Sequence, residues 1–279
     1  MISLKEIIKE QSEAENLKMI KRDPYVLMHV NNKTEKICLA AVNKNGLLLN
    51  YIDDQTEKIC LAAVKNYGRA LYFVKDQTND ICLAAVKKYG RSLEYVKVQT
   101  EEICLEAVKK DGLALQYVKD QTEEICLAAV KNHGSALQYV KDQTEEICLE
   151  AVRQNATALQ YVKHQTEEMC LEAVKQNKFY INHVKKENMT VNVIKELKDI
   201  KLALSRLDFR TKENCLTTLN LMIDDAVDKT LRSNILTKII KRFHKDKKIV
   251  DFYTKHKLWK HVKFNELKDL DVCSFCMVL

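Results

Sequence analysis

Residues 121–142 read Q-T-E-E-I-C-L-A-A-V-K-N-H-G-S-A-L-Q-Y-V-K-D, and near copies of this stretch precede and follow it without a gap. A fixed period of about 20 to 50 residues is typical of tandem-repeat proteins, in which one short unit is copied and stacked. The period here is 22 residues, and seven cysteines and all five glycines keep it. These residues are Cys38, Cys60, Cys82, Cys104, Cys126, Cys148 and Cys170, and Gly46, Gly68, Gly90, Gly112 and Gly134.

Each copy has the pattern of two short helices. In residues 121–142, Asp120 or Thr122 can cap the first helix, which would contain the apolar run 125–130. Gly134 is expected to end it in the left-handed conformation that glycine adopts readily. Residues 136–140 predict a second helix, either α or 3₁₀. Because isolated helices this short are unstable in water, each unit needs its neighbours to cover its apolar face.

The repeat pattern extends beyond the best copies. Worn copies lie at 11–32, 33–54 and 165–186, where the terminal units of a stacked array are often atypical. Pro24, Ala156 and Lys178 stand where other copies have glycine. We therefore predict an all-α fold: an α-solenoid of about eight two-helix repeats over residues 11–186, followed by a helical bundle over 187–279.

The repeat resembles a known family. Residues 129–139 and 107–117 are similar to the string A-V-K-x-N-G-x-A-L-Q-Y. This string is typical of a tandem-repeat family of unknown function that is abundant in mimivirus-type giant DNA viruses and occurs in some bacteria. The resemblance covers about residues 11–186 and implies an all-helical repeat module without an assigned activity or ligand.

The periodic cysteines predict buried thiols and a reducing compartment. They lie within an apolar run, where free cysteine behaves as a small hydrophobic residue. Equivalent residues of packed helices are about 8–10 Å apart, whereas a disulfide needs Cα atoms within about 7 Å. The same separation disfavours zinc. The N-terminus lacks a signal-peptide pattern, and no apolar run reaches membrane-spanning length. We therefore expect a cytoplasmic protein without a metal or cofactor, located in the host cytosol if the chain is viral.

The C-terminal region is basic. Residues 1–186 carry a net charge of +1, and residues 187–279 carry +6. Helical spacing of apolar residues continues at 194–207, 216–226, 235–243 and 252–262. Lysines interleaved with aromatic residues can bind nucleic acid through phosphate contacts and base stacking, or they can form an ordinary charged surface over an aromatic core. The basic residues are Lys241, Arg242, Lys245, Lys247, Lys248, Lys255, Lys257, Lys260 and Lys263, and the aromatic ones are Phe243, Phe252, Tyr253, Trp259 and Phe264.

The last four residues, from Cys276 to Leu279, fit the C-a-a-X prenylation pattern, and leucine at the end favours a geranylgeranyl group. Cys273 can carry a palmitoyl chain, and the basic stretch can face anionic lipid. Stable anchoring needs two such signals. The alternatives are an apolar tail that packs on the bundle, or a C-x-x-C metal or redox pair formed by Cys273 and Cys276.

Two variable positions flank the turn glycine, while Ile, Cys, Leu, Ala and Val of the first helix vary little and are expected to be packed. We call the residue before the glycine and the residue after it the turn edge. It is either unconstrained surface or a recognition edge. A ladder of Tyr51, Phe73, Tyr95, Tyr117, Tyr139 and Tyr161 is expected to pack in the core or at its rim. The candidate interaction residues are Tyr67, Arg69, Tyr89, Arg91, Asp111, Leu113, His133 and Ser135.

The sequence contains no pattern of catalytic residues. The glutamate pairs recur with the repeat, and every glycine is part of it, so neither an acid–base pair nor a phosphate loop is indicated. We predict a monomeric, non-enzymatic scaffold that binds another protein, and that binds a membrane surface if it is lipidated. A nucleic-acid-associated protein is the alternative, and an enzyme within residues 187–279 is a third hypothesis.

Overall fold

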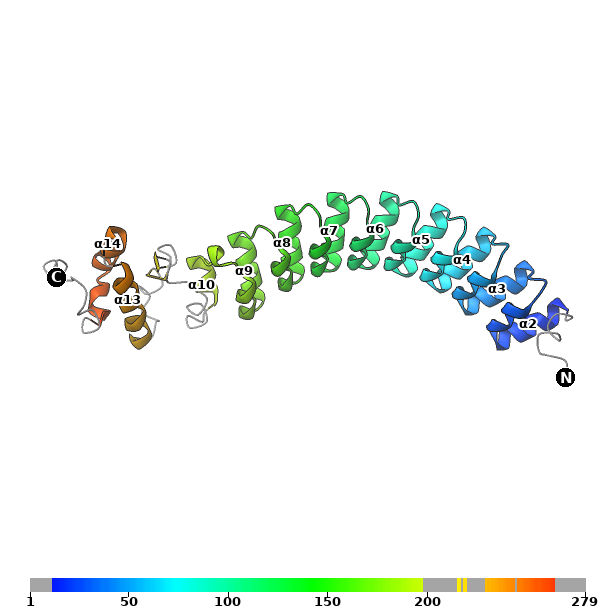
Figure 1. The fold of residues 1–279 in the computed structure, drawn as a ribbon, viewed down its shortest axis with the longest axis horizontal. Helices are drawn as coiled ribbons and strands as arrows, with labels where there is room; N and C mark the ends of the chain where they lie inside the picture. The colour runs from blue at the N-terminus through cyan, green and yellow to red at the C-terminus, as the bar shows by residue number, and fades with distance from the viewer. Residues whose placement is uncertain (1–11, 198–214, 217, 220–228, 244, 264–279) are drawn as a thin grey trace. The chain divides into compact units, whose positions relative to one another are not determined.

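The computed structural model describes residues 12–197, 215–216, 218–219, 229–243 and 245–263 (Figure 1). The chain divides into two compact units, Met1–Val162 and Lys163–Leu279. The described part is all-α, without strands. The predicted solenoid is confirmed, whereas the predicted domain boundary after residue 186 stays a prediction.

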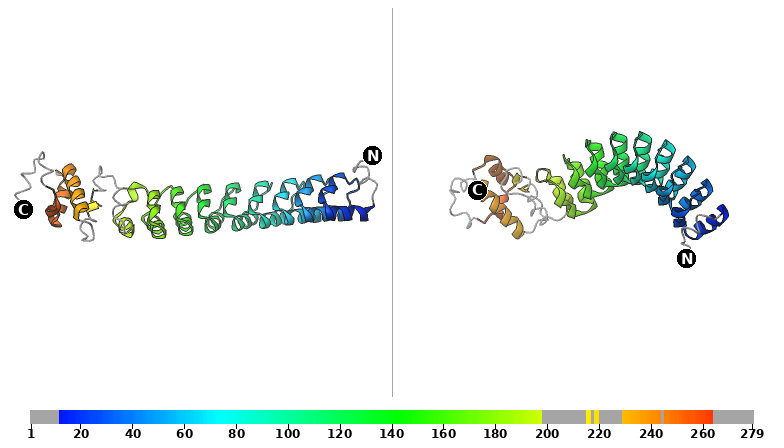
Figure 2. Two further views of the ribbon diagram at one scale, coloured as in Figure 1. Left: turned by 90° about the horizontal axis from the view of Figure 1, so that it is seen from below. Right: turned by 45° about the vertical axis from the view of Figure 1, so that its right-hand side comes forward.

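In the first unit, each repeat is a ten-residue α-helix followed by a six-residue 3₁₀ helix (η). Consecutive α-helices pack against one another, and so do consecutive 3₁₀ helices, which gives two layers (Figures 1 and 2). The pairs are α2 (Glu13–Arg22) and η1 (Pro24–His29), α3 (Glu35–Lys44) and η2 (Gly46–Tyr51), α4 (Glu57–Asn66) and η3 (Gly68–Phe73), α5 (Asn79–Lys88) and η4 (Gly90–Tyr95), α6 (Glu101–Lys110) and η5 (Gly112–Tyr117), α7 (Glu123–Asn132) and η6 (Gly134–Tyr139), and α8 (Glu145–Gln154) and η7 (Ala156–Tyr161).

The second unit begins with one more pair, α9 (Glu167–Gln176) and η8 (Lys178–His183), followed by η9 (Lys186–Asn188) and α10 (Val191–Leu197). Further along are α13 (Lys229–Phe243), α14 (Lys247–Lys255) and η10 (Leu258–His261), which pack together. The predicted helices at 235–243 and 252–262 correspond to these three elements. Most of the predicted helices at 194–207 and 216–226 lies outside the described residues.

Capping explains where each α-helix begins and ends. The Thr122 side chain accepts a hydrogen bond from the backbone N–H of Ile125 at 3.3 Å, so threonine is the N-cap and satisfies one of the free N–H groups of the first turn. His133 is extended, with φ −143° and ψ 105°. It ends α7 and at the same time begins η6, because its N–H donates to Ala129 and its carbonyl accepts from Ala136.

The expectation of a left-handed turn glycine is wrong. No glycine among the described residues has a positive φ. Glycine is needed because the next repeat lies very close to it. A Cβ built on Gly112 would lie only 2.4 Å from the carbonyl oxygen of Ala129, and one on Gly90 would lie 2.5 Å from that of Ala107. Glycine is therefore a packing requirement here, not a conformational one.

The core lies between the two layers. In the repeat that starts at Gln121, Ile125, Cys126, Ala129 and Val130 of α7 are buried, and their equivalents are buried in α3 to α6, α8 and α9. Alanine, leucine and valine of the 3₁₀ layer complete the core, as Ala136, Leu137 and Val140 do here. The leucine that follows the cysteine was expected to be packed as well. This is wrong for Leu127, which is only half-buried.

The periodic cysteines are buried free thiols, as predicted. Their environment repeats as well: the Sγ of Cys126 donates to the Oε1 of Gln121 at 3.7 Å, and Cys104 and Gln99 form the same contact. Burial raises the pKa of most of these thiols, and it raises the pKa of Cys170 to about 12. The thiols are therefore neutral core groups at physiological pH.

The first prediction compares two leucines of one repeat. Leu137→Ala should lower the free energy of unfolding by about 2–5 kcal/mol, because Leu137 is fully buried and the change leaves a cavity. Leu127→Ala should cost less than half of that, since Leu127 is half-buried. Urea unfolding of the two variants measures the difference. Equal losses would contradict the placement of Leu127.

The second prediction concerns alkaline pH. A thiol of the unfolded chain has a pKa of about 8.5, and the folded pKa of Cys170 is about 12. The unfolded state therefore loses the Cys170 proton first, and its contribution to stability is lost as pH rises from about 8.5 towards 12. Urea unfolding at several pH values should show a steeper alkaline fall in wild type than in Cys170→Ala. Tyrosine and lysine titrations are common to both proteins, so identical slopes would refute the role of Cys170.

Candidate interaction surface

The turn edge is partly accessible to solvent. Tyr67 and Tyr89 are 41% and 39% exposed, and Arg69 and His133 are also exposed. The other predicted members are half-buried: Arg91, Asp111, Leu113 and Ser135. The members of the edge therefore differ in how far they are exposed to solvent.

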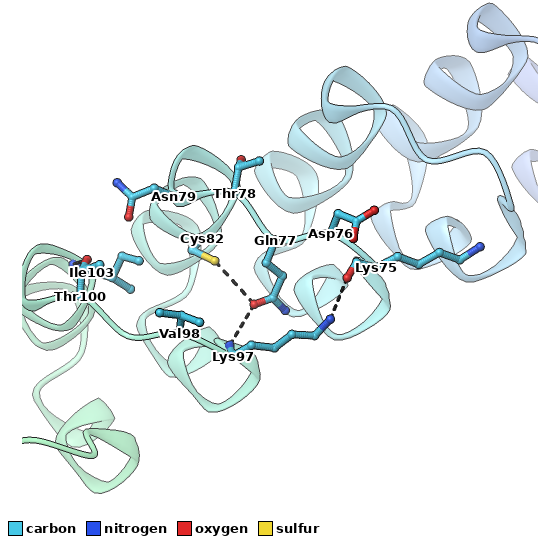
Figure 3. A pocket seen from close by; sticks show the side chains of 10 residues that line it. All are labelled: Lys75, Asp76, Gln77, Thr78, Asn79, Cys82, Lys97, Val98, Thr100 and Ile103. Carbon is cyan, nitrogen blue, oxygen red and sulfur yellow. Dashed lines mark hydrogen bonds between the residues drawn. The ribbon is translucent and has the colours of Figure 1, made fainter.

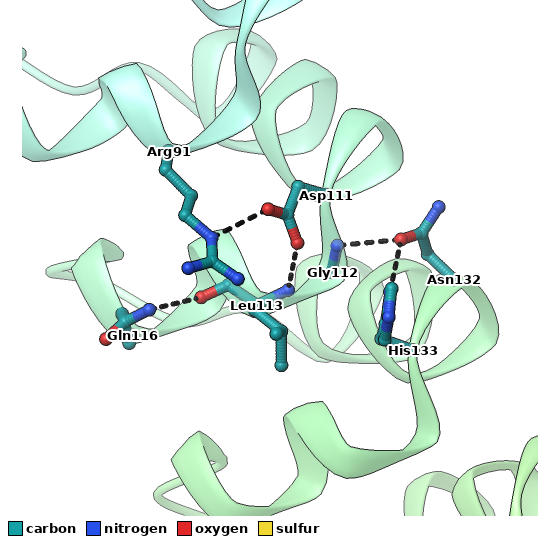
Figure 4. Close-up of polar contacts among 7 residues, drawn as sticks. All are labelled: Arg91, Asp111, Gly112, Leu113, Gln116, Asn132 and His133. Atoms are coloured by element: carbon teal, nitrogen blue, oxygen red, sulfur yellow. Dashed lines mark hydrogen bonds and ion pairs between the residues drawn. The ribbon is translucent and has the colours of Figure 1, made fainter.

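Part of the turn edge has a structural role (Figure 4). Asp111 caps η5, because its Oδ1 accepts a hydrogen bond from the backbone N–H of Leu113 at 3.0 Å. Its Oδ2 accepts from the Nε of Arg91, one repeat earlier, at 2.8 Å. Asn45, Asn155 and Asn177 cap their 3₁₀ helices in the same way. Variation at this position is therefore not entirely free.

An amide side chain ties several of the turns to the next repeat. The backbone N–H of Gly112 donates to the Oδ1 of Asn132 at 2.7 Å (Figure 4). The Asn132 amide donates in turn to the carbonyl of Lys109 at 3.0 Å. Asn66 makes the same pair of contacts with Gly46 and Asn43. Such contacts hold the glycine backbone against the following helix.

Arg69 lies among aromatic side chains. Its Nη2 donates to the hydroxyl of Tyr95 at 3.0 Å, and its guanidinium lies 6.0 Å from the centre of the Tyr95 ring. The hydrogen bond and the partial charge of the Tyr95 hydroxyl raise the pKa of Arg69, and Tyr67 contributes in the same direction. No ion pair within the described residues involves Arg69.

The tyrosine ladder is rim packing. Phe73, Tyr95, Tyr117 and Tyr139 are half-buried, and Tyr51 is 42% exposed. The most exposed tyrosine, Tyr72 at 67%, stands beside the ladder, with edge-to-face contacts to Phe73 and Tyr95 at centroid distances of 5.1 and 5.4 Å. Sequence reasoning missed this residue. The signal was present, because its repeat position varies between Met28, Asn50, Glu94 and Gln116.

The constant glutamine and lysine of the repeat, also missed, hold the linkers together (Figure 3). The Nε2 of Gln77 donates a hydrogen bond to the carbonyl of Tyr95 at 2.9 Å, and its Oε1 accepts one from the backbone N–H of Lys97 at 3.0 Å. The Lys97 Nζ donates to the carbonyl of Lys75 at 2.7 Å. A hollow of about 490 Å³ lies beside these contacts, and Val98, 77% exposed, stands at its side where neighbouring repeats have aspartate. Neither this hollow nor any other place in the described part of the chain contains a cluster of side chains that could bind a metal ion.

The predicted basic residues lie on α13, α14 and the segments around them. Eight are exposed, and Lys263 is half-buried with its Nζ donating to the Oδ1 of Asn234 at 2.7 Å. Tyr253 is fully buried, and its hydroxyl donates to the carbonyl of Leu236 at 2.7 Å. Tyr253 therefore cannot stack on a base, which corrects that part of the nucleic-acid hypothesis. The eight exposed residues are Lys241, Arg242, Lys245, Lys247, Lys248, Lys255, Lys257 and Lys260.

The lipidation candidates Cys273 and Cys276 lie outside the described residues, as does Phe264. The side chains of Phe243 and Trp259 are not described either. Across the described ranges, no helix is both long enough and apolar enough to cross a membrane.

Comparison with known proteins identifies the repeat. A family model described as a domain of unknown function (DUF4116) matches residues 34–78, 56–99, 100–143, 122–166 and 144–189. The matched segments overlap and together span residues 34–189, so each match covers about two copies of the unit. No curated protein and no solved structure is significantly similar to the chain.

Proposed function

Because the chain belongs to the DUF4116 repeat family and its copies differ mainly at one accessible edge, we propose that it is a non-enzymatic scaffold that binds another protein along that edge. The observation that carries this proposal is a constant backbone with changing side chains. The residue before the turn glycine changes from copy to copy, yet in every copy this residue ends one helix and begins the next. It is Asn45, Tyr67, Tyr89, Asp111 or His133 in five successive repeats. Stacked repeats with such edges form extended binding surfaces.

The repeat itself supports the non-enzymatic part of the proposal. Its glutamates stand in the first turns of successive helices, as Glu101, Glu123 and Glu145 do. They interact with the same helix end and with the N-cap threonine of the following repeat, where the hydroxyl of Thr144 donates to Glu123 at 3.2 Å. Identical carboxylates spread along an array do not converge on one reacting atom, as an active site requires.

The test compares two variants of the full chain. In the edge variant, Tyr67 and Tyr89 become Asn, and Arg69 and Arg91 become Thr, which are the residues that this chain itself has at 155 and 157. In the basic variant, Lys247, Lys248, Lys255 and Lys257 become Gln. Proteins that cross-link to the purified wild type in nuclease-treated eukaryotic cytosol should be lost with the edge variant and kept with the basic variant.

The alternative function is nucleic-acid binding through the exposed lysines of α13 and α14. In cytosol that has not been treated with nuclease, it predicts the opposite pattern: the edge variant retains its partners, the basic variant loses them, and added nuclease releases them. Affinity for an oligonucleotide would then fall steeply with salt, since each neutralised phosphate releases counterions. That outcome would refute the scaffold proposal.

We further propose a cytoplasmic protein of giant-virus origin that, if it ends at Leu279, is prenylated at Cys276. The expected result is an intact mass, after expression in eukaryotic cells, that shows a geranylgeranyl group and loss of the last three residues. Cys276→Ser should have an unmodified C-terminus and should not associate with membranes. An unmodified wild-type chain would contradict the lipid tether and leave the scaffold proposal intact.

A further inference from the structure

Two arginines occupy equivalent positions in consecutive repeats but have different partners. The Nε of Arg91 donates to Asp111, which the following repeat supplies, at 2.8 Å (Figure 4). The repeat that follows Arg69 has Tyr89 at the position that Asp111 takes in the next repeat, and tyrosine has no carboxylate. Arg69 is exposed, and its hydrogen-bond partners in the described part of the chain are the hydroxyls of Tyr95 and Tyr67, neither of which is a carboxylate. Arg69 therefore lacks the carboxylate that its counterpart has.

The surroundings of Arg69 have the composition of a protein-binding surface. Tyr67, Tyr72 and Tyr89 are 41%, 67% and 39% exposed, and Tyr95 lies beneath the guanidinium. Tyrosine and arginine are enriched among the residues that contribute most to protein–protein binding. We call Tyr67, Arg69, Tyr72, Tyr89 and Tyr95 the aromatic–arginine patch.

The patch is local to η3 and η4. The positions of Tyr67 and Tyr89 are occupied by Asp111, His133 and Asn155 in later repeats. The position of Tyr72 is occupied there by Gln116, Gln138 and Gln160, and the position of Arg69 by Leu113, Ser135 and Thr157. The backbone of these later repeats is the same, so they show what the patch looks like without its aromatic and cationic side chains.

We propose that the aromatic–arginine patch binds an acidic segment of a partner protein. This inference rests on the proposed scaffold function and names the chemistry of the partner. A carboxylate of the segment takes on Arg69 the place that Asp111 takes on Arg91, and an apolar side chain beside it packs on Tyr72 and Tyr89. Charge-assisted bonds from arginine to a carboxylate fix orientation, while the aromatic rings supply buried area.

A single-stranded nucleic acid can also use arginine and aromatic rings. The charge of the array favours a peptide, because residues 1–186 carry a net charge of only +1 and provide no extended positive groove for a polyanion. In addition, the equivalent arginine, Arg91, already binds a carboxylate within the chain, that of Asp111. Oligothymidylate therefore serves as a competing probe.

The experiment uses a matched pair of substitutions at one position. Tyr89→Asp places a carboxylate opposite Arg69 and should occupy it internally, as Asp111 occupies Arg91. Tyr89→Asn is nearly the same size and neutral, and this chain already has asparagine caps at 45 and 155. Both variants should fold, and circular dichroism with thermal melting checks that they do. The two variants therefore differ at Arg69 only in the charge offered to it.

The probe is a displayed library of random dodecapeptides selected against the full wild-type chain. Enriched peptides should be acidic and carry an aromatic or aliphatic residue. An enriched synthetic peptide should bind Tyr89→Asn about threefold more weakly than wild type, because the Tyr89 ring is lost while Arg69 stays available to the carboxylate. Binding should weaken by about tenfold or more in Tyr89→Asp and in Arg69→Ser. The serine of the second variant is the residue that this chain has at the equivalent position 135.

Three outcomes would overturn the inference. The first is enrichment of neutral or basic peptides only, or of none. The second is equal binding of an acidic peptide to Tyr89→Asp and Tyr89→Asn. The third is binding of oligothymidylate that falls steeply with salt and is lost in Arg69→Ser. The scaffold proposal fails separately, when the edge variant keeps every cross-linked protein.

Discussion

The close approach of each turn glycine to the following repeat is the constraint on which the stack depends. The carbonyl oxygen of Ala129 occupies the space that a side chain on Gly112 would need, and the Asn132 amide binds the glycine N–H from the same direction. Ten-residue helices do not persist alone in water, so their stability comes from this contact with a neighbour. Stability and stacking distance are therefore set together.

Hydrogen bonds from side chains that are constant in the repeat join the linkers of consecutive repeats. Gln77 joins the linker before α5 to the backbone after η4, and Lys97 reaches back to the carbonyl of Lys75. These polar contacts are individually modest, at about 1 kcal/mol each, but they recur in nearly every repeat. They fix the layer spacing without using the turn edge, so that edge can differ from one repeat to the next.

Much of this architecture was predictable, because a fixed period and two apolar runs per copy specify a helical array. The buried cysteines were predictable for the same reason. What was missed has a physical cause in each case. A glycine after a helix has the same sequence signature whether it is needed for a positive φ or for close packing, so the role of Gly134 was predicted wrongly. Constancy does not distinguish a core residue from one between two surface helices, which is why Leu127 was expected to be buried.

The candidate site was predictable in part. The variable positions beside the glycine located Tyr67 and Arg69, but their partners depend on contacts across repeats. Only the structure places the Arg69 guanidinium over Tyr95, which is 26 residues away, or Tyr72 against the same ring. Comparing Tyr89 with Asp111 requires knowing that the following repeat supplies the counter-charge.

The cap residue shared by the two helices governs how such an array can change in length. One extended residue, such as His133, ends α7 and begins η6, so the turn has no spare residue that could absorb a single insertion or deletion. Gain or loss of a whole unit, in contrast, recreates every interface as it was. The array can therefore grow only in whole steps, and each unit inserted after η4 would separate Arg69 from α8 by a further helix spacing of about 8–10 Å along the stack.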